Sequence, residues 1–186
     1  MDTVRQACHH LRQHLNVIKY YLSSGKTEDL KSYISQYRMT LPPDVARTWC
    51  ENYAVNTIVC YYAEEARKAG IDFSVRLELP KQLSINEAEL CSIFGNLLEN
   101  ALDACRECTD TAPFIRIRAR EEGGHIALAV DNTCCRAPME ENGRFRSSKH
   151  EGFGSGTASV RSIVQRYQGV TEFHYKDHIF FASVFL

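Results

Sequence analysis

The stretch CSIFGNLLENALDAC, residues 91–105, reads as a helix with two asparagines one turn apart, Asn96 and Asn100. Asparagine is a poor helix former, because its amide competes for nearby backbone groups. At 100° per residue, Asn96, Asn100 and Asp103 form a polar stripe, and Asn100 borders the apolar face. An amide there can ligate a hard cation through oxygen without adding charge, which suits a site that holds an anion. The alternative is a solvated polar face.

A second segment, EGFGSGTASVRSIVQRY, places Gly152, Gly154 and Gly156 directly before a predicted helix. A helix N-terminus offers backbone N–H groups and a partial positive charge, and glycines let the backbone approach a phosphate closely. The spacing is not that of the P-loop or of the Rossmann turn, and a flexible linker is the alternative. Lys149 lies just upstream, where it could meet a terminal phosphate. Together with the asparagines, this segment predicts a phosphate-binding site.

The N-terminal part of the chain predicts a helical hairpin. Residues 2–23 and the stretch from Thr27 to about Arg38 both read as helices, separated by a Ser-Ser-Gly turn. The run Leu41-Pro42-Pro43 is the strongest boundary signal, so we expect a hairpin domain at 1–41 and a second domain at 42–186. The hairpin has too little core of its own, and we expect it to form a homodimer through a four-helix bundle.

The second domain reads as an alternation of helices and strands. In chain order the pattern predicts a helix at 44–69, a strand at 71–79, a helix at 86–107, strands at 114–120 and 125–130, a polar loop, a helix at 157–168, and strands at 170–175 and 178–186. Tight turns between neighbouring strands imply a largely antiparallel or mixed sheet, and three amphipathic helices can cover one face. The fold class is therefore α/β, a two-layer sandwich.

Composition excludes several classes of partner. The net charge is −1, which gives no electrostatic footprint for nucleic acid, and no run of 18 apolar residues could span a bilayer. The eight cysteines include one C-x-x-C, at Cys105 and Cys108, and an adjacent pair, Cys134 and Cys135. A zinc site would need a second well-spaced pair, so the cysteines are expected to be reduced thiols in a cytosolic protein.

The asparagine helix and the glycine segment together resemble a known superfamily. LCSIFGNLLENALDAC resembles the N box, and GFGSGTASV the last glycine box, of the superfamily that joins gyrase, heat-shock chaperones, sensor histidine kinases and MutL. The resemblance covers residues 44–186. It is nearest to AgrC-like histidine kinases of the quorum-sensing type, through CENYAVNTIVCYYAEEARKAGI, GNLLENALDAC and RFRSSKHEGFGSG.

This resemblance implies the Bergerat ATP-binding fold, with ATP and Mg²⁺ held between the N-box helix and a mobile lid. Carried over by motif, Asn100 would ligate Mg²⁺, and Asn96 would position metal-bound water or phosphate. The lid corresponds to the polar segment from about Ala137 to Phe153, which we expect to be mobile without nucleotide.

One box departs from the family pattern. The usual D-x-G-x-G, whose aspartate accepts a hydrogen bond from the adenine amino group, is replaced by VDNTCC. Strand parity turns Val130 inward, so Asn132 is the next inward residue, whereas Asp131 would match if the strand ended early. The pattern favours Asn132 as the adenine contact and leaves Asp131 open. An uncharged amide there predicts reduced affinity for adenine.

The stretch ACHHLRQHLNVI resembles the phosphoacceptor motif RHDxRHHL of these kinases, with His9 in the acceptor position. On a helix whose apolar stripe is centred on Leu11, His9 lies about 160° away and His14 about 60° away. His10 occupies the place of the acid that orients the acceptor in the family, which predicts weak kinase activity. Histidines without chemistry are the alternative.

Two functions follow from these features. The leading hypothesis is the cytoplasmic core of a two-component sensor histidine kinase, which phosphorylates its own histidine with ATP and passes the phosphoryl group to a response regulator. The resemblance further implies a longer, membrane-anchored protein with a sensor region outside this chain. The alternative is a nucleotide-binding pseudokinase or docking module without phosphotransfer, which His10 and the missing glycines favour.

Overall fold

The computed structural model describes residues 17–39, 48–109, 112–141, 144–145 and 155–186. Contacts divide the chain into two compact units, Met1–Asp44 and Val45–Leu186. Within the described residues, no helix is long and apolar enough to cross a membrane.

In the first unit, residues 17–23 are helical and are followed by α2 (Thr27–Met39). Gly25 makes the turn between them with a φ of 65°, a conformation that glycine adopts without strain. The Tyr21 and Tyr33 rings contact each other across the pair, with centroids 5.9 Å apart. The predicted hairpin is therefore present over the described residues, while His9, His10 and His14 lie outside them.

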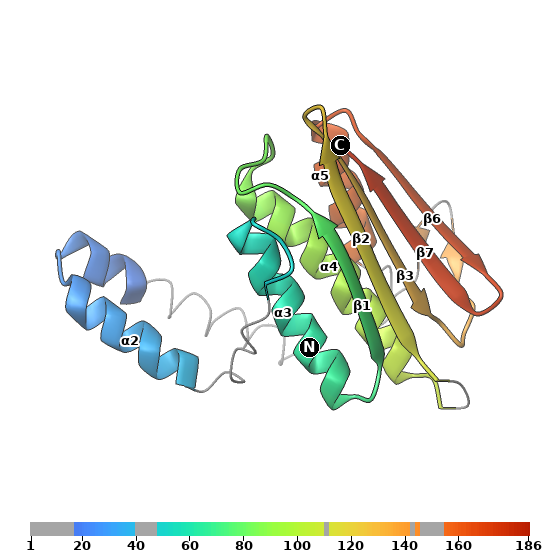
Figure 1. Ribbon diagram of the computed structural model, residues 1–186, viewed down its shortest axis with the longest axis horizontal. Coiled ribbons are helices and arrows are strands. Elements are labelled where there is room, and N and C mark those ends of the chain that lie inside the picture. Colours follow the sequence, from blue (N-terminus) through green and yellow to red (C-terminus); the bar gives the residue numbers. More distant parts are fainter. Residues whose placement is uncertain (1–16, 40–47, 110–111, 142–143, 146–154) are drawn as a thin grey trace. The chain divides into compact units, whose positions relative to one another are not determined.

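Over its described residues, the second unit is a two-layer sandwich of a five-stranded sheet and the helices α3, α4 and α5 (Figure 1). The sheet has the order β1-β2-β3-β7-β6, in which β1 and β2 are parallel and all other pairs antiparallel. Its strands are β1 (Asp72–Glu78), β2 (Phe114–Glu122), β3 (His125–Thr133), β6 (Val170–Lys176) and β7 (Ile179–Phe185). The expected mixed sheet and the α/β fold class are confirmed.

The parallel pair arises because α4 (Glu87–Arg106) connects β1 to β2 as a crossover, whereas tight turns join the other neighbours. Gly123 and Gly124 close the β2–β3 turn, and Asp177 and His178 close the β6–β7 turn, all four with positive φ. Inside the predicted loop before the last helix, β4 (Glu140–Glu141) pairs with β5 (Arg144–Phe145).

The first helix of this unit starts later than predicted. The sequence pattern placed it at 44–69, but α3 spans Tyr53–Lys68, and residues 48–52 are not helical. Asn52 is buried and caps the helix, accepting a hydrogen bond from the Val55 N–H at 3.0 Å. Its amide also donates to the Lys81 carbonyl oxygen at 3.3 Å, so a contact 29 residues away helps to fix the start of the helix.

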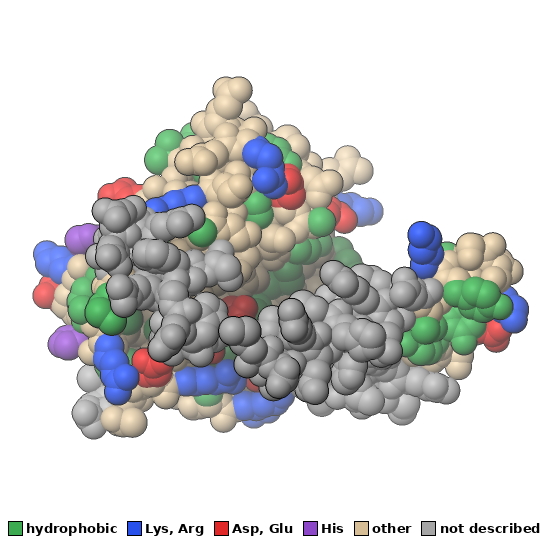
Figure 2. Space-filling model, turned by 180° about the vertical axis from the view of Figure 1, so that it is seen from behind, with side chains coloured by type: hydrophobic (Ala, Val, Ile, Leu, Met, Phe, Trp, Pro, Cys, Tyr) green, Lys and Arg blue, Asp and Glu red, His purple; other side chains and the backbone are tan. Residues whose placement is uncertain are grey.

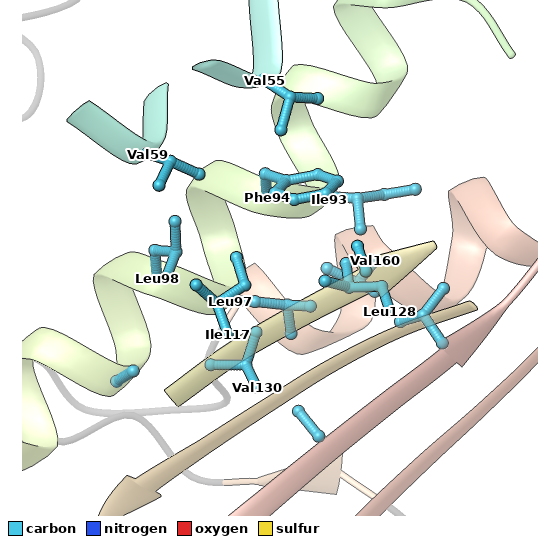
Figure 3. Close-up of a cluster of buried hydrophobic side chains, with 14 of the residues drawn as sticks. Val55, Val59, Ile93, Phe94, Leu97, Leu98, Ile117, Leu128, Val130 and Val160 are labelled. Atoms are coloured by element: carbon cyan, nitrogen blue, oxygen red, sulfur yellow. The ribbon is translucent and has the colours of Figure 1, made fainter. Parts of the chain in front are cut away.

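The core lies between the helices and the inner face of the sheet, as Figure 3 shows. Phe94 and Ile93 of α4 are fully buried, and so are Val55 and Val59 of α3. The facing strands contribute buried side chains at every second residue: Ile115 and Ile117 from β2, and Ile126, Leu128 and Val130 from β3. Val160 and Val164 of α5 (Ser155–Arg166) complete the layer.

Two of the cysteines are oxidised, contrary to the expectation from the sequence. Cys108 and Cys135 form a disulfide with their Cα atoms 5.5 Å apart, so the prediction that the cysteines are all reduced thiols is wrong for this pair. The segments that follow α4 and β3 bring them together, although 27 residues separate them in the sequence. Among the described cysteines, Cys50, Cys60, Cys91, Cys105 and Cys134 are thiols outside any disulfide. Across the described residues, no group of three or more His, Cys, Asp or Glu side chains could hold a metal ion.

Candidate nucleotide-binding site

Helix α4 holds the two asparagines at fixed positions because its start is capped by a side chain and one of its faces is buried in the core. Asn86 caps its start by accepting hydrogen bonds from the Ala88 and Glu89 N–H groups, at 2.9 and 3.3 Å. Asn96 lies half-buried and Asn100 exposed beside the buried face. The Asn96 amide donates to the Ser92 carbonyl oxygen at 2.7 Å, which leaves its own oxygen as an acceptor.

The start of α5 lies directly against these two amides. A β carbon added at Gly156 would be 3.1 Å from Asn100 Nδ2 and 3.2 Å from Asn96 Oδ1. Only glycine leaves these amides undisturbed, so the residue type at this position allows the close approach. The positive end of a helix dipole and two uncharged oxygen donors thus lie together, a combination suited to a phosphate chain and a hard cation.

Replacing Gly156 by alanine should weaken nucleotide binding without unfolding the protein. The added methyl group would displace the amides of Asn96 and Asn100 by a few tenths of an ångström. We expect the dissociation constant for ADP to rise roughly threefold, about 0.7 kcal/mol, when measured by calorimetry with Mg²⁺ present. Ser162→Ala, at an exposed position on the same helix, is the control. An unchanged affinity in the Gly156 variant would show that this contact does not shape the site.

Asn132, and not Asp131, faces the helices. Strand β3 continues to Thr133, three residues beyond the predicted end, and Asn132 pairs with the inward-facing Ile115 of β2. Asn132 is 2% exposed, and its Nδ2 donates to the Thr133 carbonyl oxygen at 2.9 Å. Because this bond fixes which way the amide points, its Oδ1 is presented as the acceptor that an adenine amino group requires.

Asp131 lies on the opposite face of the sheet. Its carboxylate accepts a hydrogen bond from Arg118 Nη2 at 2.6 Å, and Arg118 belongs to the outward side of β2. This ion pair explains how a carboxylate is accommodated with little exposure. The geometry therefore favours Asn132 over Asp131 as the adenine contact.

Of the other predicted site residues, the structure describes Asp103. Asp103 lies half-buried one turn after Asn100 on α4. Lys149, Gly152 and Gly154 lie outside the described residues, as do 142–143 and 146–153 of the predicted lid. The structure therefore brings together Asn96, Asn100 and Gly156 on neighbouring helices, with Asn132 on the sheet face that those helices cover.

Sequence reasoning missed a set of contacts that joins the two helices of the site. The Glu89 carboxylate, near the start of α4, accepts hydrogen bonds from Arg166 and, at 2.5 Å, from the Tyr167 hydroxyl, both at the end of α5. The same hydroxyl accepts from the Asn86 N–H at 3.2 Å. These contacts fix how α5 lies along α4, and so where Gly156 meets the asparagines. No local pattern signals them, because 77 residues separate Glu89 from Arg166.

The hydrogen bond from Tyr167, together with the bond and the charge of Arg166, lowers the pKa of Glu89 below its ordinary value of 4.5. A carboxyl group with a lowered pKa in the folded state stabilises the fold above the unfolded-state pKa, and this contribution is lost as the pH falls through the lower folded value. Glu89→Gln should therefore destabilise the protein at neutral pH.

The difference in denaturation midpoint between wild type and Glu89→Gln should shrink as the pH falls below 4.5. Urea titrations from about pH 7 to about pH 3 measure this. Glu87→Gln, in the same turn of α4 but exposed, is the control and should show a smaller change. A midpoint difference that stays constant over this pH range would contradict the role of the Glu89 carboxylate.

A hollow of about 610 Å³ lies elsewhere, on the sheet face away from the helices. Arg76, Arg118, Ala129, Ser183 and Phe185 are among its lining residues, and none of the predicted nucleotide residues lines it. On the face seen in Figure 2, Lys and Arg side chains of the described residues are mixed with Asp and Glu side chains. The arginines that line the hollow are paired with carboxylates: Arg76 with Glu78, Arg118 with Asp131 and Arg120 with Glu122. No glycine is among its lining residues, so we assign the nucleotide to the helical side.

The N-terminus of α5 lies against two amides of α4, and both helices cover the inner face of a mixed sheet. This arrangement defines a nucleotide-binding domain of the two-layer α/β type. The chain belongs to the GHKL domain family, whose model matches residues 85–186, more than half of the sequence. Membership of this family implies nucleotide binding. The match begins just before α4 and so includes every described residue assigned to the site.

Relatives and solved structures agree with this assignment. The C4-dicarboxylate transport sensor protein DctB of Rhizobium meliloti is 38% identical over 114 residues, which cover 58% of this chain and 18% of that protein. The sensor histidine kinase NatK of Bacillus subtilis is 25% identical over 185 residues, covering 95% of this chain and 57% of NatK. The chain thus spans from about a fifth to somewhat more than half of these relatives.

Among solved structures, a nucleotide-free form of the catalytic domain of histidine kinase ThkA superimposes with a TM-score of 0.57 at 19% identity. The superposition covers 73% of this chain and 90% of that chain. At this identity the likeness establishes the fold, which is that of a histidine kinase catalytic domain. The AgrC-like subtype stays a prediction from the sequence.

Proposed function

We propose that this chain is the catalytic core of a two-component sensor histidine kinase. In this proposal it transfers the γ-phosphoryl group of ATP to His9 and then to an aspartate of a response regulator. The observation that carries the proposal is the contact of Gly156 at the start of α5 with Asn96 and Asn100 of α4, in a chain of the GHKL family. The relatives named as sensor histidine kinases and sensor proteins support the same class of reaction.

The residues present fit a magnesium ion. Mg²⁺ favours oxygen ligands, keeps several of its waters, and commonly bridges one or two protein oxygens and substrate phosphates. Asn100 supplies an uncharged oxygen at the exposed edge of α4, beside the positive end of α5. When bound there, Mg²⁺ would neutralise charge on the phosphates. In this assignment Asn100 is its ligand and Asn96 positions its water or the phosphate.

The remaining residues bind and orient ATP. The side-chain Oδ1 of Asn132 accepts the hydrogen bond of the adenine amino group. The N-terminus of α5, with Gly152, Gly154 and Gly156, holds the phosphates. Lys149 is assigned to the terminal phosphate, and Asp103 to the polar rim beyond Asn100. Phosphoryl transfer depends mainly on such positioning and on charge stabilisation. A ring nitrogen of His9 then forms the new bond to phosphorus as the bond to ADP oxygen breaks.

The partners follow from this function. We propose that residues 1–41 form a homodimer through their helical hairpin, because the described part shows Tyr20, Leu22 and Ile34 exposed. The second partner is the receiver domain of a response regulator. Because ATP and such regulators are cytoplasmic, we propose that this core acts in the cytoplasm.

Incubation of the purified chain with γ-labelled ATP and Mg²⁺ tests the proposal. We expect label on the protein that is lost in acid and retained in base, as for a phosphohistidine, and that moves to a receiver domain on mixing. Nucleotide binding without any protein label would instead support the pseudokinase or docking module.

A further inference from the structure

Four cysteines meet where α4 and β3 end. Cys105 lies in the last turn of α4 and Cys108 just after it, while Cys134 and Cys135 directly follow β3. The Cys105 thiol donates to the carbonyl oxygens of Phe114 and Thr133, at 3.3 and 3.4 Å. Cys108 and Cys135 are joined as a disulfide. The cluster thus connects the helix of Asn100 with the strand of Asn132.

The members of this cluster differ in reactivity. Cys105 and Cys134 are buried, and burial raises the pKa of Cys105 to about 11 and also raises that of Cys134. Their protonated thiols are poor nucleophiles at neutral pH. Cys108 and Cys135 are half-exposed, and the Cys135 N–H lies 3.1 Å from Cys108 Sγ, where it would stabilise a Cys108 thiolate. The accessible pair is therefore the one suited to exchange.

The disulfide acts on one specific segment. The end of β3 is already held by Cys105 and by the hydrogen bond from the Cys134 N–H to the His178 carbonyl oxygen, at 2.8 Å. What the Cys108–Cys135 bond adds is a fixed position for the chain beyond Cys135, two residues before Ala137, where the predicted lid begins. The contacts that hold the end of β3 do not include this bond, so its opening would free only the chain just beyond Cys135.

We propose that Cys108 and Cys135 form a reversible redox site whose disulfide fixes the chain as it leaves β3 and thereby regulates nucleotide binding. The regulatory part rests on the nucleotide site proposed above. In a cytosolic chain, as the sequence predicts, a disulfide is usually transient and redox-sensing and not a permanent structural bond. Its partner in exchange is a small disulfide of the glutathione class.

The exchange is balanced in two steps. A thiolate of the protein attacks one sulfur of glutathione disulfide, forms a mixed disulfide and releases one glutathione thiolate. The second protein thiolate attacks the protein sulfur of that mixed disulfide, forms the Cys108–Cys135 bond and releases the second glutathione thiolate. The two protein thiols lose two electrons and two protons, and glutathione disulfide, as two thiols, gains them.

The test uses the whole purified chain, equilibrated with mixtures of glutathione and glutathione disulfide. Non-reducing peptide mapping should find Cys108 linked to Cys135 in the oxidised sample and free in the reduced one. Oxidation should slow amide exchange over residues 134–141 and raise the melting temperature by about 5 to 10 °C. Cys108→Ser and Cys135→Ser should each lose this response, whereas Cys91→Ser, at the other end of α4, should keep it.

Calorimetry with Mg²⁺ and ADP on the same samples tests the regulation. A restrained segment costs less to order on binding, so the oxidised chain should bind ADP at least about threefold more tightly. Absence of the linked peptide, or equal exchange over 134–141 in both redox states, would overturn the redox site. Equal ADP affinities would overturn its regulatory role. If neither state binds ADP, the proposed nucleotide site fails, and peptide mapping and exchange still decide on the redox site.

Discussion

Phosphate transfer from ATP to the protein is expected to disappear in the variant His9→Gln. Helical spacing places His9 about 160° from the apolar stripe centred on Leu11, where both a nucleotide domain and a response regulator could reach it. Glutamine resembles histidine in polarity but offers no ring nitrogen to attack the γ-phosphorus. The label that the wild type gains from γ-labelled ATP should therefore fall to background.

Two comparisons make this experiment specific. His125→Gln, at an exposed position in β3, should label like the wild type. His14→Gln should also keep its label, because helical spacing predicts that His14 lies beside the apolar stripe, where a phosphoryl group of charge about −1.5 to −2 would be costly to bury. Label that persists in His9→Gln, or that depends on His14, would sink the assignment of the acceptor.

His10 bears on the rate of the same reaction. In the family pattern an acid stands at this position and supports the acceptor ring, which a neutral imidazole cannot do by charge. Restoring the acid with His10→Asp should speed the labelling of His9. A rate no higher than that of wild type would mean that position 10 does not have the supporting role that the family motif implies.

The second large effect is expected at Asn100. Its alanine variant should bind Mg-ATP roughly tenfold more weakly or worse, a loss of about 1.4 kcal/mol or more, while ATP without Mg²⁺ is affected much less. The reason is that Asn100 offers an oxygen at the exposed edge of α4, directly beside Gly156 at the start of α5. Removing the amide takes away the assigned metal ligand but leaves the buried face of α4 intact.

Calorimetry with and without Mg²⁺ measures this, and urea denaturation checks that the variant is folded. Ser92→Ala is the matched control, because Ser92 is exposed on α4 two turns before Asn100 and its hydroxyl donates within the same helix, to the Ala88 carbonyl oxygen. Unchanged affinity for Mg-ATP in a folded Asn100→Ala protein would reject Asn100 as the magnesium ligand.

Where local signals dominate, the sequence was sufficient to predict the fold. The predicted helix at 86–107 differs from α4 by its two cap residues, Asn86 and Glu107, because the apolar period and the cap chemistry agree there. The alternation of Ile126, Leu128 and Val130 also placed Asn132 inward, as the structure has it. These are local properties of short segments.

Predictions went wrong, or were not made, where distant contacts decide. The start of α3 depends on Asn52, whose amide bonds to Lys81, 29 residues away, so helical periodicity alone extended the helix too far. The bonds of Glu89 to Arg166 and Tyr167 and the Cys108–Cys135 disulfide join segments that only the folded sheet brings together. No window of sequence contains both partners of such a contact.

The most direct test of the central claim, that nucleotide binds on the helical side of the sheet, is amide hydrogen exchange with and without Mg-ADP. We predict protection over residues 96–103 of α4, over 131–135 around Asn132, and over the first turns of α5 from Ser155, with little change in β6 (Val170–Lys176). Protection confined to β6 and the outward strand faces around the 610 Å³ hollow, or no protection at saturating Mg-ADP, would contradict it.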